Sequence, residues 1–341
     1  MRSRFTIDAG AVRRNAARLV DILHGSELWA VVKADGYGHG ALDVSRAALA
    51  GGARGLCVAT VAEGATLRAA LPEPRIVVLG PTAEHELPAA RDARLELVVG
   101  TAGPVPERVP LHLKLDTGMG RWGLSELAAG GGPEVVGVMS HFASADCDDA
   151  FTREQTRRFL EAAEPFRGRA ALHLANSAGA LRFPESRLDA ARCGIALYGV
   201  SPFGADPRAD GLEPALRWES ELALVRRLEP GESTGYGRRF VADEPTWIGI
   251  VPVGYADGFR RDLTGTTVLV GGRQCPVVGT VSMDALAVRL EGEREPGTPV
   301  TLIGDDILVE RHAAVAGTIG YELVCGLRME ADRAERTVIG A

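Results

Sequence analysis

The chain has 341 residues, of which 46% are hydrophobic and 24% are charged, and its formal net charge is −7. This is the composition of a globular protein with room for more than one domain, and the negative charge argues against general binding to nucleic acid. No apolar stretch is as long as a membrane span, the N-terminus lacks the apolar core of a secretory signal, and five scattered cysteines form no C-x-x-C pair, so we expect a cytoplasmic protein with reduced thiols and no metal site.

Residues 1–212 contain eight short apolar runs that have the character of buried strands. Most are separated by amphipathic stretches rich in alanine and arginine, such as "ALDVSRAALAGG", which are typical of helices. This alternation predicts a parallel sheet, and eight units favour a closed (β/α)8 barrel over an open, doubly wound sheet. The runs are "ELWAVVKA", "GLCVAT", "RIVVLG", "LELVVG", "LHLKLD", "VVGVMSHF", "ALHLANS" and "ARCGIALYG".

Residues 213–341 have a different sequence pattern. Valine- and threonine-rich runs such as "TWIGIVPVGYADGF" and "TPVTLIG" are punctuated by glycine and proline, which predicts a smaller, mainly antiparallel β domain. The segment between the two parts, "SPFGADPRADGLEPA", is rich in proline, glycine and aspartate and has the composition of a linker. We therefore expect a barrel domain over residues 1–212 and a β domain over residues 213–341.

The basic residues are very unevenly divided, since 36 of the 38 are arginines and only Lys33 and Lys114 are lysines. A chain this poor in lysine is expected to keep an amine where a guanidinium cannot replace it, as in a Schiff base or a carbamate. The alternative is that two lysines persist by chance. Lys33 ends the first predicted strand and Lys114 ends the fifth.

The C-terminal ends of the strands form the active-site face of a (β/α)8 barrel, and phosphate is often bound after strands seven and eight. The predicted strand ends carry Lys33, Lys114, His141, Ser177 and Arg192. A lysine suited to a Schiff base, together with a phosphate site, predicts pyridoxal 5′-phosphate (PLP) as the cofactor. The segment "GMGRWG" is a literal G-x-G-x-x-G, but no acid ends the next strand, so it is only a weak sign of a nicotinamide site.

Nine motifs, in order along the chain, resemble those of the alanine racemases, PLP enzymes built from a barrel and a β domain. The resemblance runs from Phe5 to about Gly326 and implies a homodimer with shared active sites. The motifs are "AVVKADGYGHG", "KLDTGMGRWG", "SHFASAD", "HLANSAG", "RCGIALYG", "GYG", "VGYADGF", "GTVSMD" and "TIGYELVCGL".

The resemblance also implies roles for individual residues. Lys33 is implied to hold PLP covalently and to act as one catalytic base, and Tyr236 of the partner subunit is implied to act as the other. Arg192 is implied to face the pyridine nitrogen of PLP, with His141 beside the ring. The residues implied to hold the phosphate are Tyr37, Ser177, Tyr321 and the backbone of Gly194 and Ile195.

The implied reaction is the interconversion of L-alanine and D-alanine by these two bases, as a source of D-alanine for peptidoglycan precursors. Arg121 and Met283 are implied to receive the substrate carboxylate, and Lys114 is implied to be carbamylated and to orient Arg121. One alternative is a racemase of broader range, acting for example on serine. Another is a non-catalytic PLP carrier, although such carriers consist of the barrel alone. The tail after Gly326 departs from the family pattern, and Thr280 stands where some relatives carry an arginine.

Overall fold

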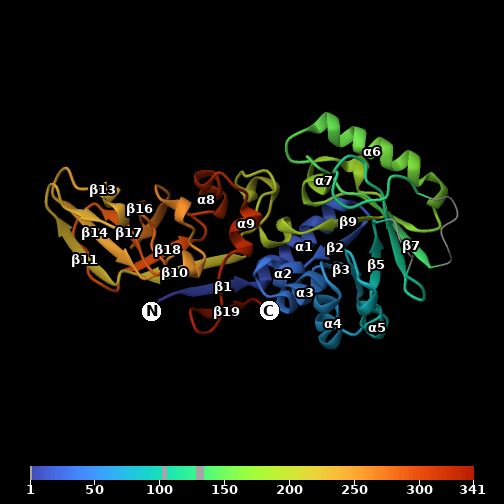
Figure 1. The fold of residues 1–341 in the computed structure, drawn as a ribbon, viewed down its shortest axis with the longest axis horizontal. Coiled ribbons are helices and arrows are strands. Elements are labelled where there is room, and N and C mark those ends of the chain that lie inside the picture. The colour runs from blue at the N-terminus through green and yellow to red at the C-terminus, as the bar shows by residue number, and fades with distance from the viewer. Residues whose placement is uncertain (1, 102–105, 128–133) are drawn as a thin grey trace. The chain divides into compact units, whose positions relative to one another are not determined.

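The chain divides into two compact units (Figure 1). The computed structural model of the protein describes residues 2–101, 106–127 and 134–341. We call the first unit the barrel unit, and it comprises Val12–Phe203 and Arg208–Glu213. The second is called the β unit, and it comprises Met1–Ala11, Gly204–Pro207 and Pro214–Ala341.

Eight parallel strands close into a barrel, which confirms the predicted fold class. Each strand pairs in parallel with the next, and the last strand pairs with the first to close the ring. Their residues are almost all buried, the pattern of a parallel sheet that is covered on both faces. The strands are β2 (Glu27–Val31), β3 (Gly55–Val58), β4 (Arg75–Val78), β5 (Glu96–Val99), β6 (Leu111–Lys114), β7 (Val135–Met139), β8 (Ala171–His173) and β9 (Ala190–Cys193).

Helices separate most of these strands, although the described residues include none between β5 and β6 or between β6 and β7. Figure 1 shows α3, α4 and α5 on the outside of the strands that they connect. Helix α6, which has 15 residues, packs against the barrel through Phe159, which is fully buried in a cluster with Val138 and Leu172. Burying a side chain of this size contributes about 2 kcal/mol to folding. The helices are α1 (Ala9–Leu23), α2 (Lys33–Tyr37), α3 (Ala41–Ala50), α4 (Val61–Ala70), α5 (Leu87–Asp92), α6 (Asp149–Ala163) and α7 (Ser177–Arg182), with short 3₁₀ turns η1 (Glu84–Glu86), η2 (Glu164–Phe166), η3 (Pro184–Ser186), η4 (Ile195–Tyr198) and η5 (Pro207–Asp210).

The β unit is built on a sheet of nine strands in the order β11-β14-β17-β16-β15-β18-β10-β1-β19, with a separate β12-β13 pair. Neighbouring strands are antiparallel except β1 and β19, which pair in parallel. The strands are β1 (Arg4–Asp8), β10 (Leu216–Glu221), β11 (Leu224–Leu228), β12 (Ser233–Thr234), β13 (Phe240–Val241), β14 (Thr246–Val251), β15 (Thr267–Val270), β16 (Arg273–Val278), β17 (Leu286–Leu290), β18 (Pro299–Ile303) and β19 (Glu335–Ile339). The helices and turns are η6 (Tyr236–Arg238), η7 (Tyr255–Asp257), η8 (Arg261–Leu263), α8 (Val309–Ala316) and α9 (Gly320–Cys325).

The N-terminal strand belongs to the β unit, although the sequence division at residue 212 assigns it to the barrel domain. Phe5 of β1 lies opposite Trp218 of β10, and the two rings stack with centroids 5.0 Å apart. On its other edge β1 pairs with β19 near the end of the chain. The hydrogen bonds and the buried face of this strand are therefore completed by residues more than 200 positions away.

Candidate active site

Lys33 follows β2 at the C-terminal end of the barrel and opens a left-handed turn. The next four residues all have positive φ: 52° at Ala34, 49° at Asp35, 62° at Gly36 and 52° at Tyr37. A left-handed conformation costs a residue other than glycine roughly 1–2 kcal/mol. Three such residues within four positions therefore need support from their surroundings.

Glu63 of α4 provides part of this support. Its Oε1 accepts the backbone N–H of Ala34 at 2.8 Å, while its Oε2 accepts the N–H of Thr60 in a capping box. Asp35 Oδ1 accepts the N–H of Ala41 at 2.8 Å on the other side of the turn. Glu63 is not among the predicted site residues, but the T-x-x-E spacing of Thr60 and Glu63 is the sequence signal of a capping box.

Ser177 begins α7 directly after β8, and its hydroxyl lies in a cradle of donors. Its Oγ accepts the backbone N–H of Gly194 at 3.0 Å and that of Ala196 at 3.4 Å, with the N–H of Ile195 between them in the chain. Tyr37 lies against the same backbone, because a Cβ on Gly194 would come within 2.5 Å of the Tyr37 Oη. Hydroxyl and backbone N–H donors gathered in this way suit an anion such as phosphate.

Arg192 on β9 is only 3% exposed and is held by five hydrogen bonds. Nη1 donates to Nδ1 (2.9 Å) and to the backbone O (2.8 Å) of His173. Nη2 donates to Ser140 O (2.7 Å), His141 Nδ1 (3.2 Å) and Leu174 O (3.2 Å). Within the described residues these bonds use the two Nη atoms, which leaves the Nε–H available to another acceptor. Burial lowers the pKa of Arg192 to about 10, so the guanidinium stays charged at neutral pH.

His141 shares its electrostatic environment with four cations. Burial, followed by the charges of Arg192, Lys114, Arg121 and Lys33, holds the pKa of His141 well below its usual range. The imidazole is therefore neutral, and its Nδ1 accepts from Arg192, which puts the proton on Nε2. These five residues, all singled out in the sequence, come together at one end of the barrel.

Lys114 ends β6 and is 5% exposed. Burial, followed by the charges of Arg121 and Arg192, lowers its pKa to about 8, although Asp116 opposes the shift. Its Nζ lies 5.8 Å from the centroid of the Trp122 ring, and Cζ of Arg121 lies 5.4 Å from the same ring. A substantial fraction of this amine is unprotonated near neutral pH, which makes it nucleophilic.

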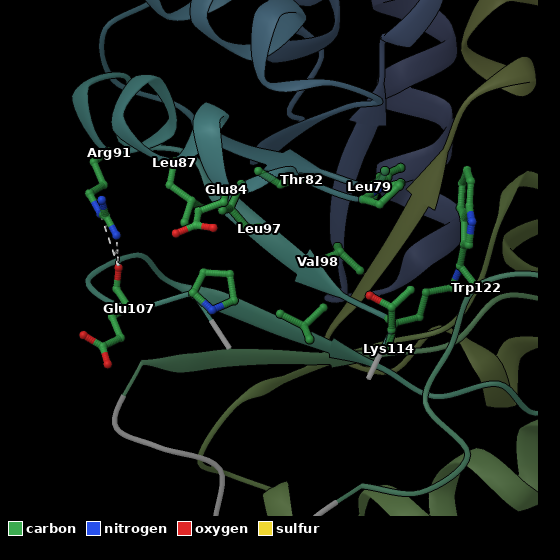
Figure 2. A pocket seen from close by; sticks show the side chains of 16 residues that line it. Leu79, Thr82, Glu84, Leu87, Arg91, Leu97, Val98, Glu107, Lys114 and Trp122 are labelled. Atoms are coloured by element: carbon green, nitrogen blue, oxygen red, sulfur yellow. Dashed lines mark hydrogen bonds between the residues drawn. The ribbon is translucent and has the colours of Figure 1, made fainter. Parts of the chain in front are cut away.

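A cavity of about 520 Å³ opens beside Lys114, and Figure 2 shows Lys114 and Trp122 at one end of it. Arg91 lies at the other end, where its Nη2 donates to the backbone O of Glu107 at 2.8 Å. The walls between them are largely aliphatic, with Leu97 among them. The volume falls in the range of small-molecule sites.

Asp116 has a structural part in the loop that carries "GMGRWG". Its carboxylate accepts the backbone N–H groups of Gly118, Met119 and Gly120 at 2.8–3.2 Å. These hydrogen bonds hold the loop in its shape and give the Asp116 carboxylate a structural role.

Three of the predicted site residues lie in the β unit rather than in the barrel. Tyr236 stands on η6 with 72% of its surface exposed, and Thr280 Oγ1 donates to its backbone O at 2.9 Å. Met283 is 53% exposed in the loop before β17, and Tyr321 lies in the first turn of α9. The barrel unit thus gathers the predicted amines, the arginines and the Ser177 cradle, whereas the predicted second base belongs to the other unit.

The described residues hold neither a candidate metal site nor a helix that could cross a membrane. In the described part of the chain no group of three or more His, Cys, Asp or Glu side chains is placed to hold a metal ion. The helices described there are all too short or too polar to cross a membrane.

Two family models match the chain. The alanine racemase N-terminal domain matches residues 7–202, and the alanine racemase C-terminal domain matches residues 215–335. The second match counts against a carrier that consists of the barrel alone.

Individual relatives agree with this result. The alanine racemase of Lactiplantibacillus plantarum is 40% identical over 94% of both chains. A crystal structure of alanine racemase from D-cycloserine producing Streptomyces lavendulae superposes with a TM-score of 0.91 at 34% identity, over 100% of this chain and 98% of that one. The biosynthetic alanine racemase of Pseudomonas aeruginosa gives a TM-score of 0.91 at 36% identity, over 99% of both chains. This chain therefore belongs to the alanine racemase family, and it is an enzyme that racemises alanine.

Proposed function

We propose that the barrel unit binds PLP through Lys33 and that the enzyme uses this cofactor to interconvert L-alanine and D-alanine. Three kinds of donor fit the group: the Lys33 amine for its aldehyde, the Ser177 cradle for its phosphate, and the Nε–H of Arg192 for its ring nitrogen. When bound, PLP supplies an electron sink that makes the α-proton of an amino acid acidic. The observation that carries the proposal is the presence of these donors at one end of one barrel.

Two bases serve the two faces of the substrate. Racemisation removes the α-proton from one face and returns a proton to the other, which two groups do most directly. Lys33 Nζ would hold the proton on one side. Tyr236 holds it on the other, and its 72% exposure on the β unit leaves it available to a second copy of the chain. We therefore infer a homodimer in which each barrel receives Tyr236 of the partner subunit.

The charge on Arg192 controls how strongly the site withdraws electrons. Its pKa of about 10 keeps its proton in place at neutral pH. A donor that does not release its proton leaves the ring nitrogen it faces largely unprotonated. With its ring nitrogen uncharged, PLP would be a weaker electron sink, which would favour return of the proton to Cα.

Arg121 and Met283 receive the substrate carboxylate in this proposal. Arg121 is an exposed cation at the barrel end, and Met283 is exposed on the β unit. Lys114 and Arg121 both lie beside the Trp122 ring. Addition of carbon dioxide to Lys114 converts a cation into an anion that pairs with Arg121 and orients it.

The D-alanine formed serves as a precursor of peptidoglycan, and the reaction takes place in the cytoplasm. This assignment rests on the family to which the chain belongs and on the substrate that its relatives carry in their names.

The proposal is tested by loss of the α-proton signal in D₂O across a panel of L-amino acids, with added PLP and a chiral readout. Exchange confined to alanine, with formation of the D-enantiomer, is expected. Exchange of several amino acids with enantiomer formation would instead establish the broader racemase. No exchange by protein that holds PLP would refute the proposal.

The two bases are separated by substituting the second one. Tyr236→Phe is expected to reduce interconversion by about 10²- to 10⁴-fold, the usual contribution of a general acid or base, while the enantiomer that faces Lys33 still exchanges its α-proton. Tyr255→Phe removes a hydroxyl from another exposed tyrosine of the β unit and serves as the control. Full interconversion by Tyr236→Phe would show that the assignment of the second base is wrong.

A further inference from the structure

A line of polar side chains runs through the interior of the barrel from Arg192 toward the opposite end. Arg192 Nη1 lies 2.9 Å from His173 Nδ1, and His173 Nε2 lies 2.9 Å from His112 Nδ1. His112 Nε2 lies 2.7 Å from Glu96 Oε2, and Glu96 Oε1 accepts from Arg75 Nε at 3.0 Å. Arg75 and Glu96 are the first residues of β4 and β5, so the line ends on the face away from Lys33 and Lys114.

The line of side chains passes strand β7 at Gly137, a position that has no side chain. His112 lies on β6 and His173 on β8, and Gly137 of the intervening strand β7 is the register partner of His112. A Cβ on Gly137 would come within 1.9 Å of His112 Nδ1. The two imidazoles therefore meet only because this residue has no side chain. Trp29, which is fully buried, packs its ring against both imidazoles and keeps water from the contact.

The donors in this line point in one direction. Arg192 can only donate, so His173 Nδ1 must accept and His173 Nε2 must carry the proton. That proton requires a lone pair on His112 Nδ1, which puts the second proton on His112 Nε2, toward the Glu96 carboxylate. If the two rings together carried a third proton, two N–H donors would face each other, either at Arg192 and His173 or at His173 and His112.

The charges agree with this arrangement. Burial lowers the pKa of both His112 and His173, and the charges of Arg192 and Arg75 act in the same direction on each, although Glu96 opposes the shift at His112. Burial alone would raise the pKa of Glu96, but the hydrogen bond from His112 and the charge of Arg75 hold it below its usual value. Two neutral rings thus lie between a buried cation, Arg192, and an anion that is 15% exposed, Glu96.

We propose that Glu96 is a positioning residue for Arg192, acting through the fixed tautomers of His112 and His173. Arg192 only donates and the carboxylate only accepts, so the two ends of the line favour the same tautomer of each ring. The carboxylate thereby helps to keep a lone pair of His173 facing Arg192 Nη1. The Nε–H of Arg192 is thereby held toward the cofactor. The orientation of Arg192 toward PLP rests on the proposed function. The tautomers of the two histidines rest only on the hydrogen bonds inside the barrel.

The test uses Glu96→Gln and Gly137→Ala holoenzymes with ¹⁵N-labelled histidine. A glutamine amide accepts or donates, so it no longer fixes the tautomers from the Glu96 end, and reversed tautomers become possible wherever the bond from Arg192 to His173 opens. In Gly137→Ala the added methyl group separates the two rings while all charges remain. Either variant is expected to change the ¹⁵N shifts of His173 and the visible absorption of bound PLP. For Glu96→Gln, kcat for alanine should fall about tenfold with KM changed less than about twofold, the size of effect seen when an outer partner that orients a histidine is lost.

Glu73→Gln is the matched control, because it removes an exposed carboxylate near Glu96 that makes no bond to a histidine. It should leave the shifts, the spectrum and kcat unchanged. If both variants showed the ¹⁵N shifts of wild-type His112 and His173, the proposed action of Glu96 through the histidine tautomers would be wrong. Altered shifts with an unchanged PLP spectrum and kcat would overturn the positioning of Arg192. If the wild-type protein binds no PLP, the proposed function fails, but the ¹⁵N shifts still show whether Glu96 fixes the tautomers of His112 and His173.

Discussion

Lys114 is expected to bind carbon dioxide at neutral pH because its pKa is lowered to about 8 from an ordinary 10.5. At pH 7.5 roughly a quarter of such an amine is unprotonated, against roughly one part in a thousand for an ordinary lysine. The fraction that reacts with carbon dioxide is therefore more than about 200-fold larger. The charges of Arg121 and Arg192 that disfavour the ammonium also favour the carbamate anion that forms when the amine adds carbon dioxide and releases a proton.

The assay is ¹³C NMR of the enzyme in ¹³C-bicarbonate between pH 6 and 9. A carbamate signal that Lys114→Met removes is expected, and it should decline as the pH falls below about 8, because the amine then takes up a proton. Arg121→Gln should weaken the signal at pH 7.5, since loss of the nearby charge raises the pKa of Lys114. A signal that survives Lys114→Met, or no carbamate signal from Lys114 at any of these pH values, would refute the reasoning.

Three further changes test the barrel cradle and the Tyr236 loop. Gly194→Ala places a Cβ 2.5 Å from the Tyr37 Oη, so PLP affinity measured by fluorescence titration should fall at least about tenfold; unchanged affinity would exclude Gly194 from the cradle. Ser177→Ala leaves two buried N–H groups without their acceptor, which should cost about 1–3 kcal/mol of unfolding free energy in urea without PLP, and wild-type stability would show that the Oγ does not hold them. Thr280→Val removes the donor to the Tyr236 backbone O, so kcat should fall a few-fold while PLP affinity is unchanged; a loss of PLP affinity instead would contradict a role confined to the loop.

The barrel could be predicted from the sequence because its signals are local. Each strand is a short run that is buried on both faces, as in "RIVVLG", and most neighbouring runs are separated by an amphipathic helix. Strand ends follow directly from such runs, which places Lys33, Lys114 and Arg192 at one end before any coordinates are known. The rarity of lysine singled out two of these three residues independently.

The parts that sequence reasoning missed depend on distant partners. Strand β1 is five residues long, and its neighbours Glu219 and Glu335 at Arg4 are supplied by segments more than 200 residues away. Similarly, nothing in the sequence spacing of Glu96 and His112 shows that their side chains, on the neighbouring strands β5 and β6, are hydrogen-bonded to each other. The glycine that lets His112 reach its partner has no pattern around it, since its significance is the space that a methyl group would fill.

The same charges explain the pKa values of this site and its expected ligands. Lys33, Lys114, Arg121 and Arg192 all act on His141 and lower its pKa. Asp116, the carboxylate that opposes the pKa shift of Lys114, accepts backbone N–H groups of its own loop. Four cations around one neutral imidazole repel one another in the free protein, so a dianionic phosphate, a substrate carboxylate or a carbamate on Lys114 each relieves part of that repulsion. Anions that bind only the folded protein stabilise it by mass action. The excess positive charge therefore explains three properties of this barrel end. Lys114 is reactive enough to add carbon dioxide, His141 stays neutral, and the site favours anionic ligands.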